Sequence, residues 1–321
     1  MVYKTIKYVN KPVSEIVFGC ANPAMIQGKR VTKLLDAAFD AGINTFDTAE
    51  NYGASEQMLG KWIKKRKNRD EVVIITKGCH PYGESRLNVE ALKDDLEQSF
   101  KRLKTDFIDI YMLHRDHPEA DIKSILEILN EYRKAGKIGA FGVSNWTHQR
   151  IEEVNRYAAE HELVPFTVSS PNFGPAKQIE DPWSGGCVSI SGLDNEDARK
   201  WYQENRIPVF AYSCLGRGMF SGKVKTENLE HTKENMDKYA IKGYWCQENI
   251  DRLARIEEIA KKRGCSVAQI SLAWTMQQKF DVFPIVTISD VKRIAENVNA
   301  ADIRLSEEEM ESIEHGNSIY S

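Results

Sequence analysis

The chain has 321 residues, 41% hydrophobic and 28% charged, so it can bury a large core and lacks the composition of a disordered or low-complexity protein. Its 44 Lys and Arg against 47 Asp and Glu give a net charge of −3, which offers no argument for binding nucleic acid or an anionic membrane. The six cysteines form no C-x-x-C pair, the first residues contain no apolar leader core, and no apolar run approaches the roughly 18 residues of a membrane span. We therefore expect a cytoplasmic protein with reduced thiols, no membrane association and no metal site.

Short β-branched runs alternate with longer runs of helical periodicity along the chain. We expect strands at residues 15–20, 44–47, 72–76, 108–113, 139–143, 166–169, 209–212 and 282–288. Helices are expected at about 33–39, 55–65, 88–103, 122–134, 148–161, 193–205, 248–262, 267–277 and 291–299, with an appended C-terminal helix at 306–315.

This alternation predicts a parallel α/β sheet with right-handed crossovers, and eight units favour a closed (β/α)8 TIM barrel over an open doubly wound sheet. The first strand is not followed by G-x-G-x-x-G, which argues against a Rossmann domain. Because no linker or composition shift divides the chain, we expect a single domain over residues 1–321. The long loops after strands six and seven, 171–192 and 215–247, leave the rim where barrels place active sites, and we expect them to act as lids.

Four polar residues follow or end three successive strands, namely Asp47, Tyr52, Lys77 and His114. The carboxyl ends of neighbouring barrel strands share one rim, so these side chains should converge. An ammonium beside a tyrosine favours the phenolate and lowers a pKa that is ordinarily about 10, and an aspartate can hold that ammonium in place. A histidine in the same pocket can donate a hydrogen bond to a carbonyl oxygen. The set suits proton donation during hydride addition to a carbonyl group.

Six segments occur in chain order: GINTFDTAENYG at 42–53, ITK at 75–77, LH at 113–114, GVSN at 142–145, AYSCLG at 211–216 and SDVKRIAEN at 289–297. Together they resemble signatures of the aldo-keto reductase family, in which the last is the segment that binds the adenosine phosphate. Residues 1–20 are similar to the N-terminal β-hairpin that plugs the bottom of the barrel in this family.

The resemblance implies an NAD(P)H-dependent reductase of aldehydes or ketones. In it Tyr52 would be the proton donor, Lys77 would lower its pKa, Asp47 would anchor Lys77, and His114 would orient the carbonyl. NADP(H) is favoured over NAD(H), with cofactor contacts expected at Ser144, Asn145, Ser170, Tyr212, Ser213, Leu215, Gly216, Gly218, Ser289, Arg293 and Asn297. Ser170 stands where the family usually has Gln, and Thr287 where some members have a Lys for the 2′-phosphate, a phosphate that Arg293 could bind instead.

Other interpretations of the same residues stay open. The chain could be a nicotinamide-binding redox-sensing or regulatory subunit with little turnover, or an aldolase or isomerase that uses Lys77 as a Schiff base. A cluster of polar residues beside the catalytic positions is either a solvated rim or a pocket for a sugar-like carbonyl: His80, Arg115, Asp116 and His117. The expected partner is a small-molecule carbonyl substrate, and the sequence leaves monomer or homo-oligomer unresolved.

Overall fold

The computed structural model describes residues 1–316, in which eight parallel strands close into a barrel in the order β10-β3-β4-β5-β6-β7-β8-β9. The strands are β3 Val17–Gly19, β4 Thr45–Asp47, β5 Val73–Gly78, β6 Ile108–Leu113, β7 Ile138–Ser144, β8 Val168–Ser170, β9 Val209–Ala211 and β10 Val282–Val286. The predicted (β/α)8 fold is thus confirmed.

Two compact units make up the chain, and each is described by itself. The first contains Met1–Ser170 and Thr287–Ile294; the second contains Pro171–Val286 and the described part of Ala295–Ser321. The single domain over residues 1–321 stays a prediction, and its last five residues lie outside the described part.

The first unit begins with the expected N-terminal hairpin, in which β1 (Tyr3–Lys4) pairs antiparallel with β2 (Val13–Ser14). Polar contacts join this hairpin to the residues just before β4 and β5: Asn44 Nδ2 donates to Pro12 O at 2.7 Å, and Lys11 Nζ to Val72 O at 2.6 Å. Lys11 also pairs with the buried Asp109 on β6, Nζ to Oδ1 2.6 Å. The hairpin therefore covers the amino-terminal end of the strands, opposite the rim where the site is expected.

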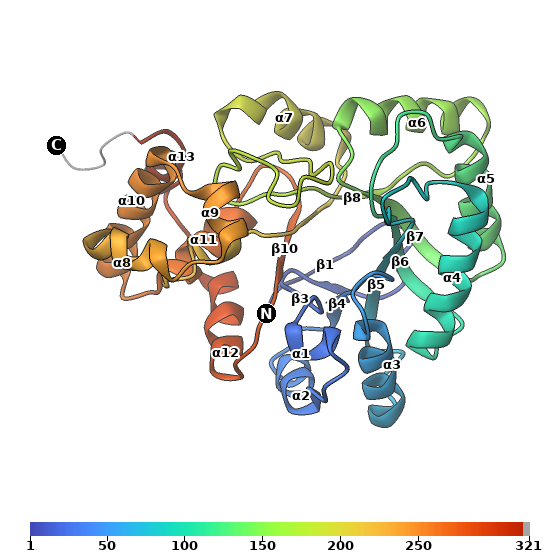
Figure 1. Cartoon of the computed structure of the whole chain (residues 1–321), viewed down its shortest axis with the longest axis horizontal. Helices are drawn as coiled ribbons and strands as arrows, with labels where there is room; N and C mark the ends of the chain where they lie inside the picture. The colour runs from blue at the N-terminus through green and yellow to red at the C-terminus, as the bar shows by residue number, and fades with distance from the viewer. Residues whose placement is uncertain (317–321) are drawn as a thin grey trace. The chain divides into compact units, whose positions relative to one another are not determined.

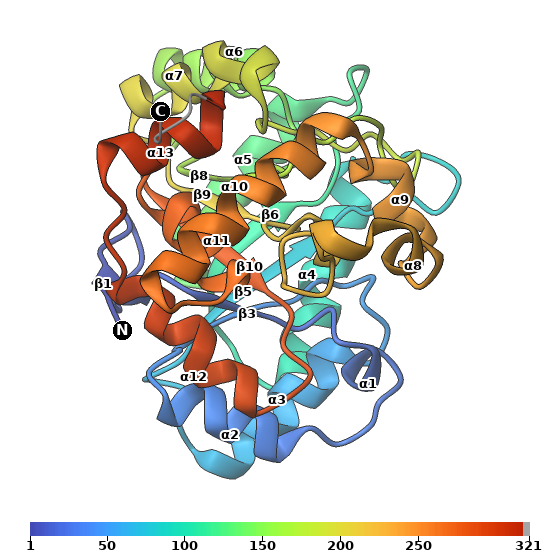
Figure 2. The same ribbon diagram turned by 90° about the vertical axis from the view of Figure 1, so that its left-hand side faces the viewer.

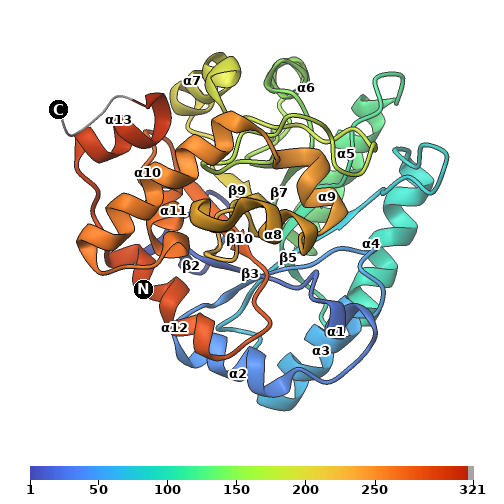
Figure 3. The same ribbon diagram turned by 60° about the vertical axis from the view of Figure 1, so that its left-hand side comes forward.

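Helices follow the strands of the first unit and flank them, as Figure 1 shows for α4 and α5. Their bounds are α1 Pro23–Ile26, α2 Thr32–Asp40, α3 Ser55–Arg66, α4 Val89–Leu103, α5 Ile122–Lys134 and α6 His148–Glu160. The short α1, which the sequence did not predict, packs against α3 (Figure 3). Every residue of β5, β6 and β7 is buried, which explains why these segments read as nearly continuous apolar runs.

The second unit is mostly helical around β9 and β10. It contains α7 Glu196–Asn205, α8 Leu229–Glu234, α9 Lys238–Tyr244, α10 Gln247–Arg263, α11 Val267–Met276, most of α12 Lys292–Asn299, and α13 Glu307–His315, with short 3-10 turns between them. Helix α10 packs against α11 and α13 (Figure 2). The loop expected at 215–247 holds two helices, α8 and α9, that the sequence did not predict. Within residues 1–316, no helix has both the length and the apolar character that crossing a bilayer requires.

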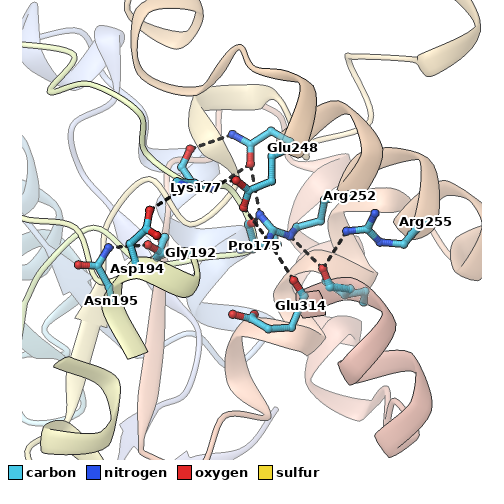
Figure 4. Close-up of polar contacts among 12 residues, drawn as sticks. Pro175, Lys177, Gly192, Asp194, Asn195, Glu248, Arg252, Arg255 and Glu314 are labelled. Carbon is cyan, nitrogen blue, oxygen red and sulfur yellow. Dashed lines mark hydrogen bonds and ion pairs between the residues drawn. The ribbon is translucent and has the colours of Figure 1, made fainter. Parts of the chain in front are cut away.

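Arg252, on α10, joins three parts of the second unit (Figure 4). Its side chain is buried and donates from Nε to Ile313 O at 2.9 Å and from Nη2 to Glu314 O at 3.1 Å, which satisfies carbonyl groups at the end of α13. Nη1 donates to Pro175 O at 2.9 Å, within the segment expected to be a lid. Next to it, Asn249 exchanges two hydrogen bonds with the Lys177 backbone, at 2.9 and 2.8 Å. The start of this segment is therefore fastened to α10.

Replacing Arg252 should destabilise the protein far more than replacing an exposed arginine of the same helix. Arg252→Leu removes the donor to the Pro175 and Glu314 carbonyl groups and leaves Ile313 O with only the 3.4 Å bond from Arg255, which we expect to lower the free energy of unfolding by about 3 kcal/mol. Arg263 also reaches α13, through an exposed pair with Glu309, so Arg263→Leu should lower it by less than about 1 kcal/mol. Urea unfolding of both variants measures the difference. Equal losses would show that the Arg252 contacts add nothing beyond a surface ion pair.

Candidate active site

A buried ion pair lies at the carboxyl end of β4 and β5. Lys77 Nζ donates to Asp47 Oδ1 at 2.5 Å and to the Thr48 carbonyl oxygen at 3.0 Å. Only 3% of the Lys77 side chain and 4% of the Asp47 side chain are exposed. The pair forms because β4 and β5 run parallel with Asp47 opposite Ile75, so both side chains emerge at the same rim.

Tyr52 and His114 lie beside this ion pair. Lys77 Nζ is 5.4 Å from the centroid of the Tyr52 ring, and the Tyr52 ring is 5.8 Å from the His114 ring, edge to face. His114 follows β6 directly, and its backbone N–H donates to Gly78 O at 2.9 Å, which ties it to the end of β5. The structure thus brings together all four residues that the sequence singled out for chemistry.

Burial dominates the proton affinity of Tyr52. It raises the pKa of Tyr52 above the usual value, while the Lys77 ammonium acts in the opposite direction and the Asp47 carboxylate adds to the rise. The sequence led us to expect a lowered pKa, because the effect of the lysine can be read from a motif and the desolvation cannot. Tyr52 therefore holds its proton more tightly than a free tyrosine does and is protonated at neutral pH.

The two members of the ion pair respond to burial in opposite ways. Burial raises the pKa of Asp47, and the Lys77 ammonium counteracts this rise. Burial lowers the pKa of Lys77, but the Asp47 carboxylate, followed by Tyr52, outweighs it, so the pKa of Lys77 is raised. Lys77 therefore stays an ammonium ion. A Schiff base requires the neutral amine, so this geometry disfavours the aldolase alternative.

His114 is neutral in this environment. Burial lowers its pKa well below the usual value, and Lys77, Arg115 and His80 act in the same direction. Its Nδ1 is buried and has no hydrogen-bond partner among the described residues. A neutral imidazole can donate a hydrogen bond to a carbonyl oxygen without releasing a proton to it.

Three of the expected nicotinamide contacts form one cluster at the ends of β7 and β8. Ser144 lies opposite Ser170 in the sheet and donates from Oγ to Ser170 O at 2.9 Å. Asn145 Nδ2 donates to Ser144 Oγ at 3.0 Å and to His114 O at 3.2 Å. Asn145 also adopts a left-handed backbone with φ 61°, which turns the chain away from the strand. The cluster therefore joins the expected carboxamide-binding residues to the backbone of His114.

The expected contacts for the adenosine phosphate lie around the start of α12. Ser289 and Arg293 are both exposed in the first unit, and Asn22 Nδ2 fixes the preceding backbone by donating to Ile288 O at 2.9 Å. Asn297, in the second unit, is buried. An exposed arginine in the first turn of a helix suits an anionic group.

In the second unit, the residues expected along the ring and the pyrophosphate form a tight series of turns after β9. Tyr212 is half-buried and donates its N–H to Pro171 O at 3.3 Å. Left-handed backbone recurs after it, with φ of 49° at Ser213, 55° at Gly216 and 106° at Gly218, and Leu215 between them has φ −103°. Arg217 is left-handed as well, with φ 52°. The N–H groups of Gly216 and Gly218 donate to Ser213 O at 2.8 Å and to Leu215 O at 3.0 Å, so the segment is a run of internally bonded turns.

Sequence reasoning gave no role to two residues next to the tetrad, Cys20 and Glu50. Cys20, at the end of β3, donates its N–H to Asp47 O at 2.7 Å, but burial raises the pKa of its thiol well above the usual value, so it is no nucleophile. The sequence left His80 either on a solvated rim or in a substrate pocket, and its ring lies 4.8 Å from that of His114. Glu50 accepts a hydrogen bond from Tyr82 Oη at 2.8 Å. Position at the end of a strand was the available signal for Cys20.

Comparisons with known proteins identify the family of the chain. The model of the Aldo/keto reductase family matches residues 15–317. The aldo-keto reductase str7 of Strobilurus tenacellus is 30% identical over 88% of this chain and 79% of its own, and the aldo-keto reductase yakc [NADP(+)] of Schizosaccharomyces pombe is 29% identical over 98% and 91%. Among solved structures, a thermostable aldo-keto reductase, Tm1743, in complex with the inhibitor epalrestat, superposes with a TM-score of 0.71 at 25% identity, covering 98% of both chains.

The lowered pKa of His114 predicts that its ring stays neutral as the pH falls from about 7 to about 6, a range in which an ordinary histidine becomes charged. Ring-nitrogen NMR of the folded protein measures this directly, and a His114→Gln variant identifies the resonance. Because the unfolded chain binds this proton more tightly, the residue should also make stability fall as the pH drops through about 6.5. Titration of the His114 resonance near pH 6.5 would contradict the prediction.

Proposed function

The chain belongs to the aldo/keto reductase family and is an oxidoreductase that reduces an aldehyde or ketone, and we propose that Tyr52 is the proton donor of this reaction. The observation that carries the proposal is the position of Tyr52 between the charged Lys77 and the neutral His114. Tyr52 keeps its proton at neutral pH, and the nearby ammonium stabilises the phenolate that remains after donation.

The cofactor is NADP(H), which supplies the hydride when bound. The S. pombe relative carries NADP(+) in its name, and we propose that the turns at 213–218 lie along the pyrophosphate. We propose that Ser144, Asn145 and Ser170 hold the carboxamide and that Tyr212 stacks on the nicotinamide ring. Arg293 would bind the 2′-phosphate, with Ser289 and Asn297 along the same segment.

The other three members of the tetrad have distinct proposed roles. Lys77 supplies positive charge beside the Tyr52 hydroxyl, and Asp47 keeps Lys77 charged and in place. His114 donates a hydrogen bond to the substrate carbonyl oxygen, which orients the carbonyl and stabilises negative charge developing on that oxygen. These roles fit a reductase better than a regulatory subunit with little turnover, which the family relationship does not favour.

We also propose that the substrate has a polar group near its carbonyl, as a sugar-like ketone or aldehyde does. His80 and Arg115 lie beside His114: the rings of the two histidines are 4.8 Å apart, and Arg115 Nη1 donates to His114 O at 3.1 Å. Turnover of keto-sugars faster than simple aldehydes would support this substrate class, and the reverse order would contradict it.

The cytoplasm is the proposed location. None of the six cysteines forms a disulfide bond, which suits a reducing compartment.

Tyr52→Phe should abolish most turnover while cofactor affinity is unchanged. Loss of a general acid costs about 10²- to 10⁴-fold in kcat, and the phenyl ring preserves the packing. The measurements are NADPH oxidation with a carbonyl panel and fluorescence titration with NADPH. Tyr157→Phe, which removes an exposed hydroxyl on α6, is the matched control. A Tyr52→Phe enzyme with native kcat would refute the proposed mechanism.

Arg293→Met should weaken NADPH binding and leave NADH binding unchanged. Loss of a charge-assisted bond to the 2′-phosphate is expected to raise the NADPH Kd by about 10- to 100-fold. Lys292→Met, which removes the neighbouring exposed charge, should change the NADPH Kd much less. Fluorescence titrations with both cofactors decide the matter, and an equal loss for NADPH and NADH would assign Arg293 to another part of the cofactor.

A further inference from the structure

Arg102, which is not part of the tetrad, contacts the segment that carries Tyr52 through one guanidinium nitrogen. Arg102, near the end of α4, directs Nη1 at three oxygens: Glu50 O at 3.4 Å, Glu50 Oε1 at 3.6 Å and Glu56 Oε2 at 3.3 Å. Glu50 lies two residues before Tyr52 and Glu56 four residues after it. Arg102 therefore holds residues 50–56, which we call the tyrosine loop, on both sides of Tyr52.

The same two glutamates are bonded to β5 on either side of the Thr76–Lys77 peptide. The Thr76 hydroxyl donates to Glu56 Oε1 at 2.6 Å, and the Glu50 N–H donates to the Lys77 carbonyl oxygen at 2.9 Å. Arg102 is thus connected to Thr76 through Glu56 and to Lys77 through Glu50.

Helix packing fixes the position of Arg102. An added Cβ at Gly60, on α3, would lie 2.5 Å from Arg102 O, so α3 and α4 approach closely only because Gly60 has no side chain. Glu56, on the same helix, is 1% exposed. Burial raises the pKa of Glu56, and the hydrogen bond from Thr76 and the charge of Arg102 oppose this rise. The guanidinium is thus a nearby counter-charge for a buried carboxyl group.

We propose that Arg102 is a positioning residue that fixes the distance between the Tyr52 hydroxyl and the Lys77 ammonium by clamping Glu50 and Glu56. The clamp acts through these two glutamates and does not touch the reacting atoms. It rests on the proposed roles of Tyr52 and Lys77. Without it, the tyrosine loop is held to β5 by fewer contacts and moves away from Lys77.

Arg102→Met keeps much of the side-chain volume and removes the charge. We expect kcat with 4-nitrobenzaldehyde to fall by about 10- to 100-fold, the cost of misplacing a catalytic group, with the NADPH Kd unchanged. Lys101→Met, which removes an exposed charge from the same turn of α4, should behave as the wild type. Arg102→Lys retains a positive charge on a shorter side chain, so its kcat should fall less than that of Arg102→Met.

A second measurement, the pKa of Tyr52, distinguishes a misplaced tyrosine from a smaller amount of folded enzyme. It does not require turnover. Ultraviolet difference titration of each protein against its Tyr52→Phe counterpart gives the pKa of Tyr52. The charged or titratable groups that act on this hydroxyl are Lys77, Asp47, Arg115 and Cys20, so Arg102 reaches it only through the loop. When the loop moves away from Lys77, the pKa of Tyr52 should rise in Arg102→Met and stay constant in Lys101→Met.

Native kcat and an unchanged Tyr52 pKa in folded Arg102→Met would overturn the clamp. So would a loss of kcat that merely follows the folded fraction. If Arg102→Met fails to fold, Glu56→Gln takes its place, with kcat and the pKa of Tyr52 measured in the same way. This variant keeps an acceptor for the Thr76 hydroxyl and removes the charge that faces Arg102. Failure of the proposed function can be told apart from failure of the clamp. If Tyr52 is not the proton donor, the Tyr52→Phe enzyme remains active, whatever the effect of the Arg102 variants.

Discussion

The buried ion pair between Lys77 and Asp47 is the constraint on which the site depends. Withdrawing both charges from water is costly, and the pair persists only because the 2.5 Å contact and the Thr48 carbonyl replace the lost solvation. That geometry requires β4 and β5 to keep their parallel register, since a shift of one residue would direct Lys77 out of the pocket. Fold and site are therefore linked through two neighbouring strands.

Two acidic side chains on the surrounding helices hold the end of β5 on each side of Lys77. Glu56, on α3, accepts the Thr76 hydroxyl, and Asp95, on α4, accepts the Cys79 N–H at 2.7 Å. Cys79 has a left-handed backbone with φ 59°, a conformation that needs such an anchor in a residue with a side chain. Lys77 is thus placed by contacts made behind the strand as well as within the pocket.

The sequence was most informative where burial is uniform. β6 and α5 have the predicted bounds, Ile108–Leu113 and Ile122–Lys134, because one is a fully buried run and the other a regular amphipathic stripe. It was least informative where structure depends on distant partners. The short helices α8 and α9 lie in a polar segment without a strong stripe, and the contacts of Arg102 with Glu50 join residues 52 positions apart. The raised pKa of Tyr52 was unreadable for the same reason, since desolvation is set by the whole fold.

The charges of the site explain why a raised tyrosine pKa is compatible with carbonyl reduction. Lys77 and Asp47 offset one another, while Tyr52 and His114 are both uncharged at neutral pH. Tyr52 and His114 thus offer two neutral hydrogen-bond donors to a neutral carbonyl group, with the Arg115 cation beside them. In the proposed reaction, negative charge on the Tyr52 oxygen would be stabilised by the Lys77 ammonium, whose Nζ lies 5.4 Å from the centroid of the tyrosine ring. Such an ammonium would act more strongly on the charge of the transition state than on the neutral ground state, as catalysis requires.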